Sequence, residues 1–449
     1  MIAELVASGV LAYFAYATVQ LSVGTRSTVR SLSAPPPEAV PKGLRFVILL
    51  PALREDRVIG KTLARFAELI RRGADLDVIV STTEREELER DLGRSTTAEV
   101  VRELLPLLGD RFSLVECPKD APRGKVSQVN GAFEAWTKTH RDVDPHSVYV
   151  GVYDADSAPD PLVLARISEV IAQHDAAQRK RPAILQQVSS YCVGLDTMRG
   201  FVGALRLADA LAQTRWALGF EYPLYETFAR SVHRGTLRPL IYCVGHGCFV
   251  SAATLNAVGG FPTISPNDDL ALGYLASSSA FDVHPIPALD YCEVAPNPLV
   301  LIRQARFWYA GSARFWKDIV EFRRTFPVKR NVLQEIVLWS SGHGRRIAWA
   351  WRAALWTFAL VAAGRAQAWS LIIALVVLHA LYVHAGFLQT IFALREIPCA
   401  ADVIGLRRVR ASQWLLAFAL ASFVFVIRSL GPLSAALVGP ARGAFKTER

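Results

Sequence analysis

The chain of 449 residues lacks the spaced cysteines of a zinc finger or of a disulfide framework. Its six cysteines are scattered and form no Cys-x-x-Cys pair, so we expect reduced thiols, as in the cytoplasm. No sequence motif of a nucleic-acid-binding protein is present either, although the net charge is +10. Because arginines cluster beside apolar segments, this charge indicates attraction to anionic lipids. We therefore expect membrane lipids, and no nucleic acid, among the partners.

The first apolar stretch, residues 2–23, has no basic residue before it, which argues against a cleaved signal peptide. It is long enough to cross a bilayer, and Arg26 and Arg30 follow it. Basic residues favour the cytoplasmic side, so we expect residues 1–24 to form a transmembrane anchor whose C-terminal end lies inside. Residues 25–43, which include SLSAPPPEAVPKG, are expected to form a proline-rich linker.

Apolar stretches return near the other end of the chain, at residues 347–364, 369–394 and 414–438. The last of these is interrupted by Arg428 and by Gly431-Pro432, so we expect two or three transmembrane helices over residues 346–438. With three, the chain crosses the membrane four times in all. If the last stretch is re-entrant, the chain crosses three times, and the basic tail of residues 439–449 lies inside.

The middle of the chain alternates short apolar runs with amphipathic stretches. The apolar runs are RFVILLP (45–51), LDVIVST (76–82), RFSLVEC (111–117) and SVYVGVYD (147–154). Helix-like stretches lie between them at residues 57–71, 84–105 and 123–138. The alternation predicts an α/β domain over residues 44–300, with a mostly parallel, Rossmann-like sheet. Ligands bind at the carboxyl ends of such strands, so the residues that follow each strand are candidates for a binding site.

Asp154 and Asp156 follow the fourth apolar run. Two carboxylates at the end of a buried strand are costly unless they are neutralised. A hard cation such as Mg²⁺, bound together with substrate phosphate, would neutralise them. The alternative is a capped loop, in which Asp154 or Ser157 accepts hydrogen bonds from the backbone.

Asp268 and Asp269 begin a helix-like run within ISPNDDLALGY (264–274). Acidic residues in the first turn of a helix are stabilising in themselves, so a plain helix start is one reading. The functional reading is a general base, because a carboxylate beside an acceptor hydroxyl can remove its proton.

Two further charged residues are expected at the same edge of the sheet, one at the end of a strand and one at the start of a helix. Glu55 closes the first strand, and Lys125 begins the stretch at 123–138. The ammonium of Lys125 would bind a diphosphate or pair with Asp154, or it is an ordinary solvated lysine. His246 lies between two glycines and is interpreted as structural rather than as a ligand.

The stretch LIRQARFWYAGSARFW (301–316) is rich in arginine and aromatic residues. One reading is a helix that lies on the bilayer surface, and residues 301–345 are expected to form such interfacial amphipathic helices. The second reading adds a ligand-binding role for Gln304, Arg306 and Trp308, because aromatic faces stack on sugar rings and arginine stabilises a departing diphosphate.

Taken in order, these motifs over residues 44 to about 316 resemble the membrane-integrated family 2 glycosyltransferases of the GT-A fold, the group that includes cellulose and hyaluronan synthases. The resemblance implies that Pro51 and Glu55 touch the nucleobase, and that Lys125 and Asn130 lie near the diphosphate. It implies that Asp154 and Asp156 contact the ribose side and a Mg²⁺ or Mn²⁺ ion, and that Asp269, the second member of the pair with Asp268, is the base. Gln304, Arg306 and Trp308 correspond to the family's Gln-x-x-Arg-Trp motif.

Two positions depart from the family pattern. The second strand ends in Thr82, Thr83 and Glu84 where the family commonly has a base-reading aspartate, which leaves the nucleobase open. Arg306 comes one position early, a rotation of about 100° on a helix.

By this resemblance the protein is expected to be an inverting glycosyltransferase of the hexosyltransferase type at the cytoplasmic face of the cell membrane. The expected donor is a UDP- or GDP-sugar, and the acceptor is a lipid, a lipid-linked molecule or a polysaccharide. Single transfer is favoured over polymerisation, because three or four spans are few for a pore. The alternative is a non-catalytic membrane or transport subunit with a degenerate nucleotide-sugar domain.

Overall fold

The computed structural model describes residues 2–35, 43–88, 94–265, 267–326 and 331–439, and within them eight strands form one sheet. The strands are β1 (Arg45–Pro51), β2 (Leu76–Thr83), β3 (Phe112–Cys117), β4 (Val148–Val152), β5 (Ala158–Pro159), β6 (Ile184–Ser190), β7 (Cys248–Ser251) and β8 (Val283–Tyr291). Their order is β3-β2-β1-β4-β7-β6-β8-β5, and only the pairs made by β7 and the β5–β8 pair are antiparallel. The predicted α/β architecture with a mostly parallel sheet is confirmed.

The central strands are apolar throughout because both faces of the sheet are covered. Val47, Ile48 and Leu49 of β1 are fully buried, with alternate side chains in two separate hydrophobic clusters. The register pairs Leu49 of β1 with Val152 of β4. The two strands therefore end side by side, and the segments that follow Pro51 and Val152 emerge at the same edge of the sheet.

Six helices cover this sheet: α2 (Ile59–Arg71), α4 (Thr97–Leu108), α5 (Lys125–Thr139), α6 (Val163–Ala176), α9 (Ala252–Val258) and α10 (Asp268–Ser279). Of these described helices, α2, α4, α5 and α10 lie in stretches that the sequence predicts to be helical. The stretch expected at 84–105 is not one helix. It contains the short α3 (Arg85–Leu88), and α4 begins afresh after Thr96, whose hydroxyl and the Glu99 carboxylate form a capping box. Residues 89–93 lie outside the described residues.

A helical segment that the sequence analysis did not identify leaves the sheet after β6. It comprises α7 (Gly200–Trp216), the π-helical turn η3 (Ala217–Glu221) and α8 (Tyr222–Arg234). A Cβ at Gly24 would come within 2.1 Å of the Gly219 carbonyl oxygen, and one at Gly219 within 2.7 Å of the Leu21 carbonyl oxygen. Glycine at both positions therefore allows the first apolar helix to contact η3 through backbone atoms.

In the part of the chain that the structure describes, four helices are long and apolar enough to cross a membrane: Glu4–Leu32, Val332–Arg365, Trp369–Glu396 and Ala411–Val438. They correspond to α1 (Ile2–Leu32), α13 (Val332–Arg365), α14 (Trp369–Ala380) continued through the π-helical η4 (Leu381–Ala385) and α15 (Gly386–Glu396), and α17 (Ala411–Val438). Apolar helices at both ends of the chain are thus confirmed. Residues 25–32, expected in the linker, are helical because α1 continues past Gly24. Residues 36–42 of the linker and 440–449 of the tail lie outside the described residues.

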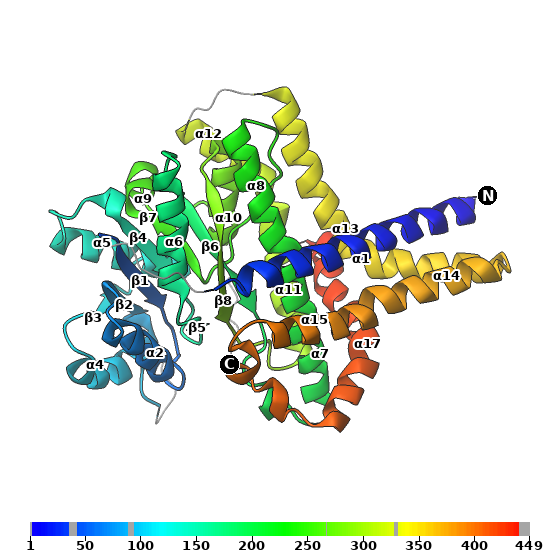
Figure 1. Ribbon diagram of the computed structural model, residues 1–449, viewed down its shortest axis with the longest axis horizontal. Helices are drawn as coiled ribbons and strands as arrows, with labels where there is room; N and C mark the ends of the chain where they lie inside the picture. Colours follow the sequence, from blue (N-terminus) through cyan, green and yellow to red (C-terminus); the bar gives the residue numbers. More distant parts are fainter. Residues whose placement is uncertain (1, 36–42, 89–93, 266, 327–330, 440–449) are drawn as a thin grey trace.

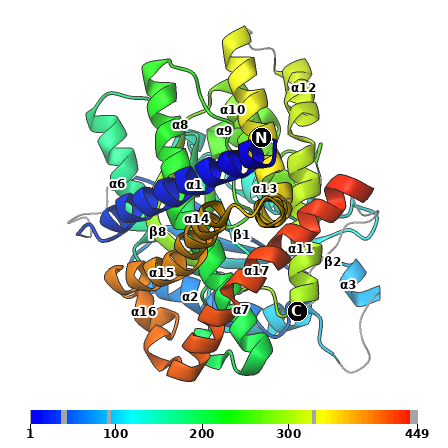
Figure 2. The same ribbon diagram turned by 90° about the vertical axis from the view of Figure 1, so that its right-hand side faces the viewer.

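The apolar helices are not all parallel. In Figure 1, α1, α14 and the later part of α13 project together away from the sheet. Figure 2 looks along α14 and shows α17 from the side, so the last helix lies across the direction of the others. No break occurs at Gly431-Pro432, since α17 runs continuously to Val438. Arg428 in this helix forms a buried ion pair with Asp209 of α7, at 2.6 Å.

The segment expected to be interfacial, residues 301–345, contains most of α11 (Pro298–Ala313) and all of α12 (Phe315–Thr325). Its last part, from Val332, is the beginning of α13, and residues 327–330 lie outside the described residues. A Cβ at Gly431 would lie 2.3 Å from the Ile302 carbonyl oxygen, so α17 packs against α11 at close range. The remaining helical turns are η1 (Pro145–Ser147), η2 (Leu195–Thr197), α16 (Ala400–Val403) and η5 (Leu406–Arg408).

Candidate active site

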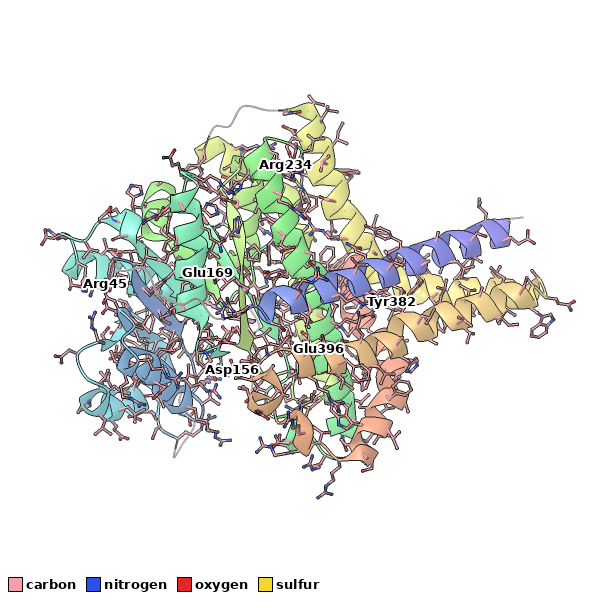
Figure 3. The ribbon with its side chains drawn as sticks, viewed as in Figure 1. Arg45, Asp156, Glu169, Arg234, Tyr382 and Glu396 are labelled. Atoms are coloured by element: carbon pink, nitrogen blue, oxygen red, sulfur yellow. The ribbon has the colours of Figure 1, made fainter. Side chains whose placement is uncertain are left out.

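One large cavity lies where the carboxyl ends of β1, β2 and β4 face the helical half of the molecule. Its volume is about 1,500 Å³, above the roughly 300–1,000 Å³ of a pocket for one small ligand. Figure 3 shows Asp156 at this boundary and Tyr382, which also lines the cavity, among the apolar helices. Nine of the predicted site residues line it: Pro51, Glu55, Lys125, Asp154, Asp156, Asp268, Asp269, Gln304 and Trp308.

Lys125 and Asp154 form an ion pair in the cavity wall. The Lys125 Nζ atom is 2.7 Å from Oδ1 of Asp154, and it also donates a hydrogen bond to the carbonyl of Gly245. Burial would lower the pKa of Lys125, but the negative charges of Asp154, Asp268 and Asp269 outweigh burial and raise it. Lys125 is therefore a permanent cation at the start of α5, where the first backbone N–H groups of the helix also attract anions.

Asp268 and Asp269 occupy the first turn of α10, after the N-cap position Asn267. A Cβ at Gly245 would lie 2.9 Å from Oδ2 of Asp269 and 3.3 Å from Nζ of Lys125, so this glycine lets the backbone fit between the two groups. Burial, followed by the charge of Asp268, raises the pKa of Asp269 to about 7 in spite of Lys125. Burial also raises the pKa of Asp268. A carboxylate with a pKa near neutrality can accept a proton under ordinary conditions, as a general base must.

The second aspartate of the Asp-x-Asp pair lies near groups contributed by β8 and the loop before β7. Asp156 is buried. Burial raises the pKa of Asp290, at the end of β8, and the negative charges of Asp154 and Asp156 also raise it. The Oδ2 atom of Asp290 is 2.7 Å from Nδ1 of His246, and Sγ of Cys292 is 3.3 Å from the same nitrogen. Carboxylate oxygens with one imidazole nitrogen suit Mn²⁺, and carboxylates with substrate phosphate suit Mg²⁺. The donor set around Asp154 and Asp156 thus fits either predicted metal, with His246 and Asp290 as additional neighbours that sequence reasoning did not assign.

At the carboxyl ends of β1 and β2, the cavity is lined by Glu55, Arg54, Thr83 and Arg85. Arg54 has φ = 59°, a left-handed conformation that is strained for a non-glycine residue and is found preferentially at functional sites. Thr83 takes the place at which an aspartate was expected by family resemblance. Arg85, at the start of α3, adds a cation to the cavity wall that was not predicted from the sequence.

Helix α11 contributes Gln304 and Trp308 to the cavity, but not Arg306. The Arg306 guanidinium instead donates to the Gly439 carbonyl at the end of α17, at 2.9 Å. The position of Arg306 around the helix turns its guanidinium away from the cavity, and the role that the family motif gives it stays a prediction. The arginine of α11 that lines the cavity is Arg303. It lies one helical turn before Phe307, which also lines the cavity.

Asn130, expected near the diphosphate, does not line the cavity. Its side-chain amide exchanges two hydrogen bonds with the backbone of Phe261, at 3.0 and 2.8 Å. Asn130 therefore holds the loop after α9 against α5, which is a structural role.

From Asp269 the cavity continues into the helical half, where arginines and aromatic rings line it. Arg345 and Arg352, both on α13, lie over rings, with guanidinium carbons 5.7 Å from the Tyr242 centroid and 5.3 Å from that of Phe425. Arg345 hydrogen-bonds backbone carbonyls and Arg352 reaches the Tyr382 hydroxyl, so within the described ranges no carboxylate neutralises them. Each also keeps a buried N–H group with no hydrogen-bond partner among the described residues. This end of the cavity therefore carries uncompensated positive charge.

Comparisons with known proteins agree with the fold. The family model described as glycosyltransferase like family 2 matches residues 41–311, whereas no curated protein matches the chain. Among solved structures, the mannosyltransferase PcManGT from Pyrobaculum calidifontis in complex with GDP-Man and Mn²⁺ has 17% identity and a TM-score of 0.52, covering 90% of this chain and 98% of that one. S. aureus TarS 1-349 has 12% identity and a TM-score of 0.39, covering 89% and 93%. The family model matches more than half of the chain, so the α/β domain is of the GT-A type and the protein belongs to the family 2 glycosyltransferases.

Proposed function

We propose that this glycosyltransferase moves a sugar from a nucleotide-diphospho-sugar to a lipid-linked acceptor, with inversion at the anomeric carbon and Asp269 as the base. The observation that carries the proposal is the single cavity, which holds Lys125, Asp154 and Asp269 at one end and unneutralised arginines among apolar helices at the other. A volume of about 1,500 Å³ has room for a donor and for part of a second substrate.

The donor would lie along the carboxyl ends of the strands, with its nucleobase near Glu55 and Thr83. Lys125 and the first turn of α5 would hold the diphosphate. Asp154 and Asp156 would hold a Mg²⁺ or Mn²⁺ ion, which when bound supplies positive charge to the diphosphate. The similar mannosyltransferase is a complex with GDP-Man and Mn²⁺, which agrees with a GDP- or UDP-sugar here.

In the transfer step, the acceptor hydroxyl oxygen attacks the anomeric carbon from the side opposite the diphosphate. The new carbon–oxygen bond forms as the bond to the diphosphate oxygen breaks, and the hydroxyl proton passes to Asp269. Negative charge grows on the departing diphosphate, where Lys125 and Arg303 stabilise it. Because Arg306 points away, Arg303 takes the role that the family motif gives to its arginine. Trp308 would supply a face on which the sugar ring stacks.

The acceptor is inferred from the other end of the cavity. Buried guanidinium groups without a counter-ion are costly, and an anionic group bound beside them would offset that cost. Arg345 and Arg352 lie on a helix that is apolar enough to enter a membrane. The chemistry that meets both conditions is a lipid with a phosphate head group, whose chain lies between the apolar helices.

We place the catalytic domain at the cytoplasmic face of the cell membrane. The basic segment between α15 and α17, with Arg407, Arg408 and Arg410, lies on the same side of the helices as the sheet (Figure 1), and basic segments stay inside. The direction of α17 in Figure 2 favours three crossings, by α1, α13 and α14, with α17 along the membrane surface. Exposed Leu415 and Phe423 on α17 would then contact lipid.

The test is an assay of the purified full-length protein with a panel of UDP- and GDP-sugars, with a polyprenyl phosphate and with Mn²⁺ or EDTA. We expect release of one nucleotide, dependent on the metal and the lipid, together with a glycosylated lipid. Failure of every donor, with the lipid and with extracted membrane glycans, would support the rival account of a non-catalytic membrane subunit.

A further inference from the structure

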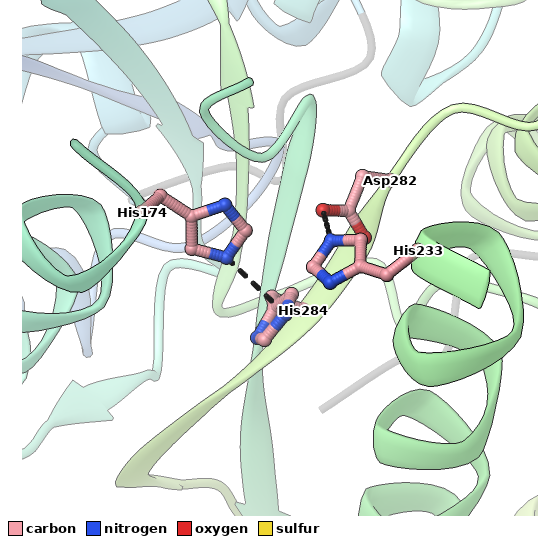
Figure 4. Close-up of side chains that lie close together, drawn as sticks. All are labelled: His174, His233, Asp282 and His284. Atoms are coloured by element: carbon pink, nitrogen blue, oxygen red, sulfur yellow. Dashed lines mark hydrogen bonds and ion pairs between the residues drawn. The ribbon is translucent and has the colours of Figure 1, made fainter. Parts of the chain in front are cut away.

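A second cluster of titratable side chains lies outside the cavity. Figure 4 shows His174 from α6, His233 from α8, and Asp282 and His284 at the start of β8, converging on one point. None of the four lines the cavity. His284 and Asp290 lie six residues apart on β8, so the cluster is about 20 Å from the catalytic end of that strand.

The geometry of the cluster is that of a ligand set. One potential ligand atom from each of the four side chains lies within 4.8 Å of every other. The Nε2 atoms of His174 and His284 are 3.4 Å apart, and Nε2 of His233 is 2.7 Å from Oδ2 of Asp282. Four ligands held tetrahedrally at 2.0–2.1 Å from a zinc ion are about 3.3 Å from one another. The His174–His284 distance already has this value, and the other ligands need to move by about 1 Å or less.

The hydrogen bond made by His174 directs one lone pair of this ring into the cluster. Nδ1 of His174 is 2.9 Å from the Lys180 carbonyl oxygen, which can only accept, so the ring proton lies on Nδ1. Nε2 of His174 therefore directs a lone pair at His284. A histidine whose outer nitrogen donates to a carbonyl is the usual arrangement of a metal ligand.

The remaining members are also suited to binding a cation. Oδ1 of Asp282 is buried and has no hydrogen-bond partner among the described residues. Nε2 of His284 lies 3.4 Å from Nε2 of His174, so its ring presents a nitrogen to the same point. Imidazole nitrogens and carboxylate oxygens are both ligands of zinc-type ions.

We propose that His174, His233, His284 and Asp282 bind one zinc-type divalent ion in a structural site. Three imidazole nitrogens and one carboxylate oxygen favour Zn²⁺, Co²⁺ or Ni²⁺ over Mg²⁺. On binding, the Nε2 proton of His233, which faces Asp282, and that of His284, which faces His174, leave or move to Nδ1 of the same ring. The exposed Arg179 beside Nδ1 of His233 then turns away. The ion ties α6 and α8 to the first residues of β8. Since α8 continues from α7 and η3, the site anchors the segment that contacts the apolar helices to the edge of the sheet.

The test uses the full-length protein in detergent, stripped with a chelator, loaded with Zn²⁺ and desalted. We expect one zinc ion per chain by mass spectrometry, and its loss in both His284→Gln and His174→Gln. His146→Gln, at an exposed histidine outside the cluster, should keep the ion. Asp154→Asn should keep it as well, which separates this site from the catalytic one.

A second measurement does not depend on the folding of a variant. Co²⁺ added to the stripped wild-type protein should give the intense visible absorption of tetrahedral cobalt, and Zn²⁺ should raise the Tm by a few degrees. No cobalt spectrum in the wild type, or equal zinc content in wild type and His284→Gln, would overturn the proposal.

Discussion

The ammonium nitrogen of Lys125 lies 2.7 Å from Oδ1 of Asp154 and contacts the carbonyl of Gly245, the residue that also borders Asp269. One cation therefore connects the two functional ends of the site: the carboxylate at the strand end, which belongs to the donor, and the carboxylate proposed as the base. This connection gives each substitution a distinguishable effect.

Lys125→Met should lower kcat/KM for sugar transfer by about 100-fold, because the cation that faces the diphosphate is lost. The positive charge of Lys125 also lowers the pKa of Asp269, so its removal should move the acidic limb of the pH profile to higher pH. Lys138→Met is the matched control, since Lys138 lies on the same helix but pairs on the surface with Glu134. Equal loss of activity in both variants would contradict the assignment.

The wild-type pH profile follows from the pKa of Asp269, which is about 7. A base must have lost its proton before it can accept another, so activity requires the ionised carboxylate. As the pH falls below 7, the ionised fraction shrinks, and kcat/KM should decrease by about tenfold per pH unit. A profile that stays flat down to pH 5 would show that Asp269 does not titrate in the step measured.

Arg303 and Arg306 lie on the same helix and differ in direction, so they form a natural pair of variants. Arg303→Ala should reduce transfer by about 10- to 100-fold, since its guanidinium lines the cavity. Arg306→Ala should leave kcat/KM nearly unchanged and cost only about 1 kcal/mol of stability through the lost hydrogen bond to Gly439. The reverse result would restore Arg306 to the site and would mean that α11 rotates when the donor binds.

Arg352→Gln should raise the KM for a polyprenyl phosphate acceptor by about tenfold or more, because one cation beside its phosphate is removed. Slow hydrolysis of the donor, measured without acceptor, should be unaffected. Arg365→Gln, at the exposed end of the same helix, provides the control. An effect of Arg352→Gln on donor binding alone would argue against an acceptor site at this end of the cavity.

The residues that follow strands could be predicted well from the sequence. The strands at Arg45–Pro51 and Val148–Val152 are continuous apolar runs, and their parallel pairing brings Glu55 and Asp154 to one edge. Lys125 and Asp269 were found because each begins a helix after a loop, and the cavity contains both.

The missed features depend on contacts between distant segments. In the sequence, Arg428 interrupts an apolar stretch. Its partner Asp209 lies more than two hundred residues earlier in the chain, so only the folded structure shows the ion pair. Arg303 and Arg306 are both arginines on α11 and differ only in the direction in which their side chains leave the helix. That direction depends on how α11 packs against Gly431. The histidine cluster has no sequence signature, because its members come from three separate elements. The roles of the site residues themselves remain predictions.

The most direct test of the account is sugar transfer by Asp269→Asn, measured together with donor affinity. The amide keeps the size of the side chain but cannot accept the proton of the acceptor hydroxyl, so we expect kcat to fall by about 100-fold or more. The Kd for the nucleotide-sugar should change by no more than about threefold, because the residues proposed to hold the diphosphate and its metal ion are Lys125, Asp154 and Asp156. Transfer at the wild-type rate by Asp269→Asn would contradict the assignment of the base and with it the proposed mechanism.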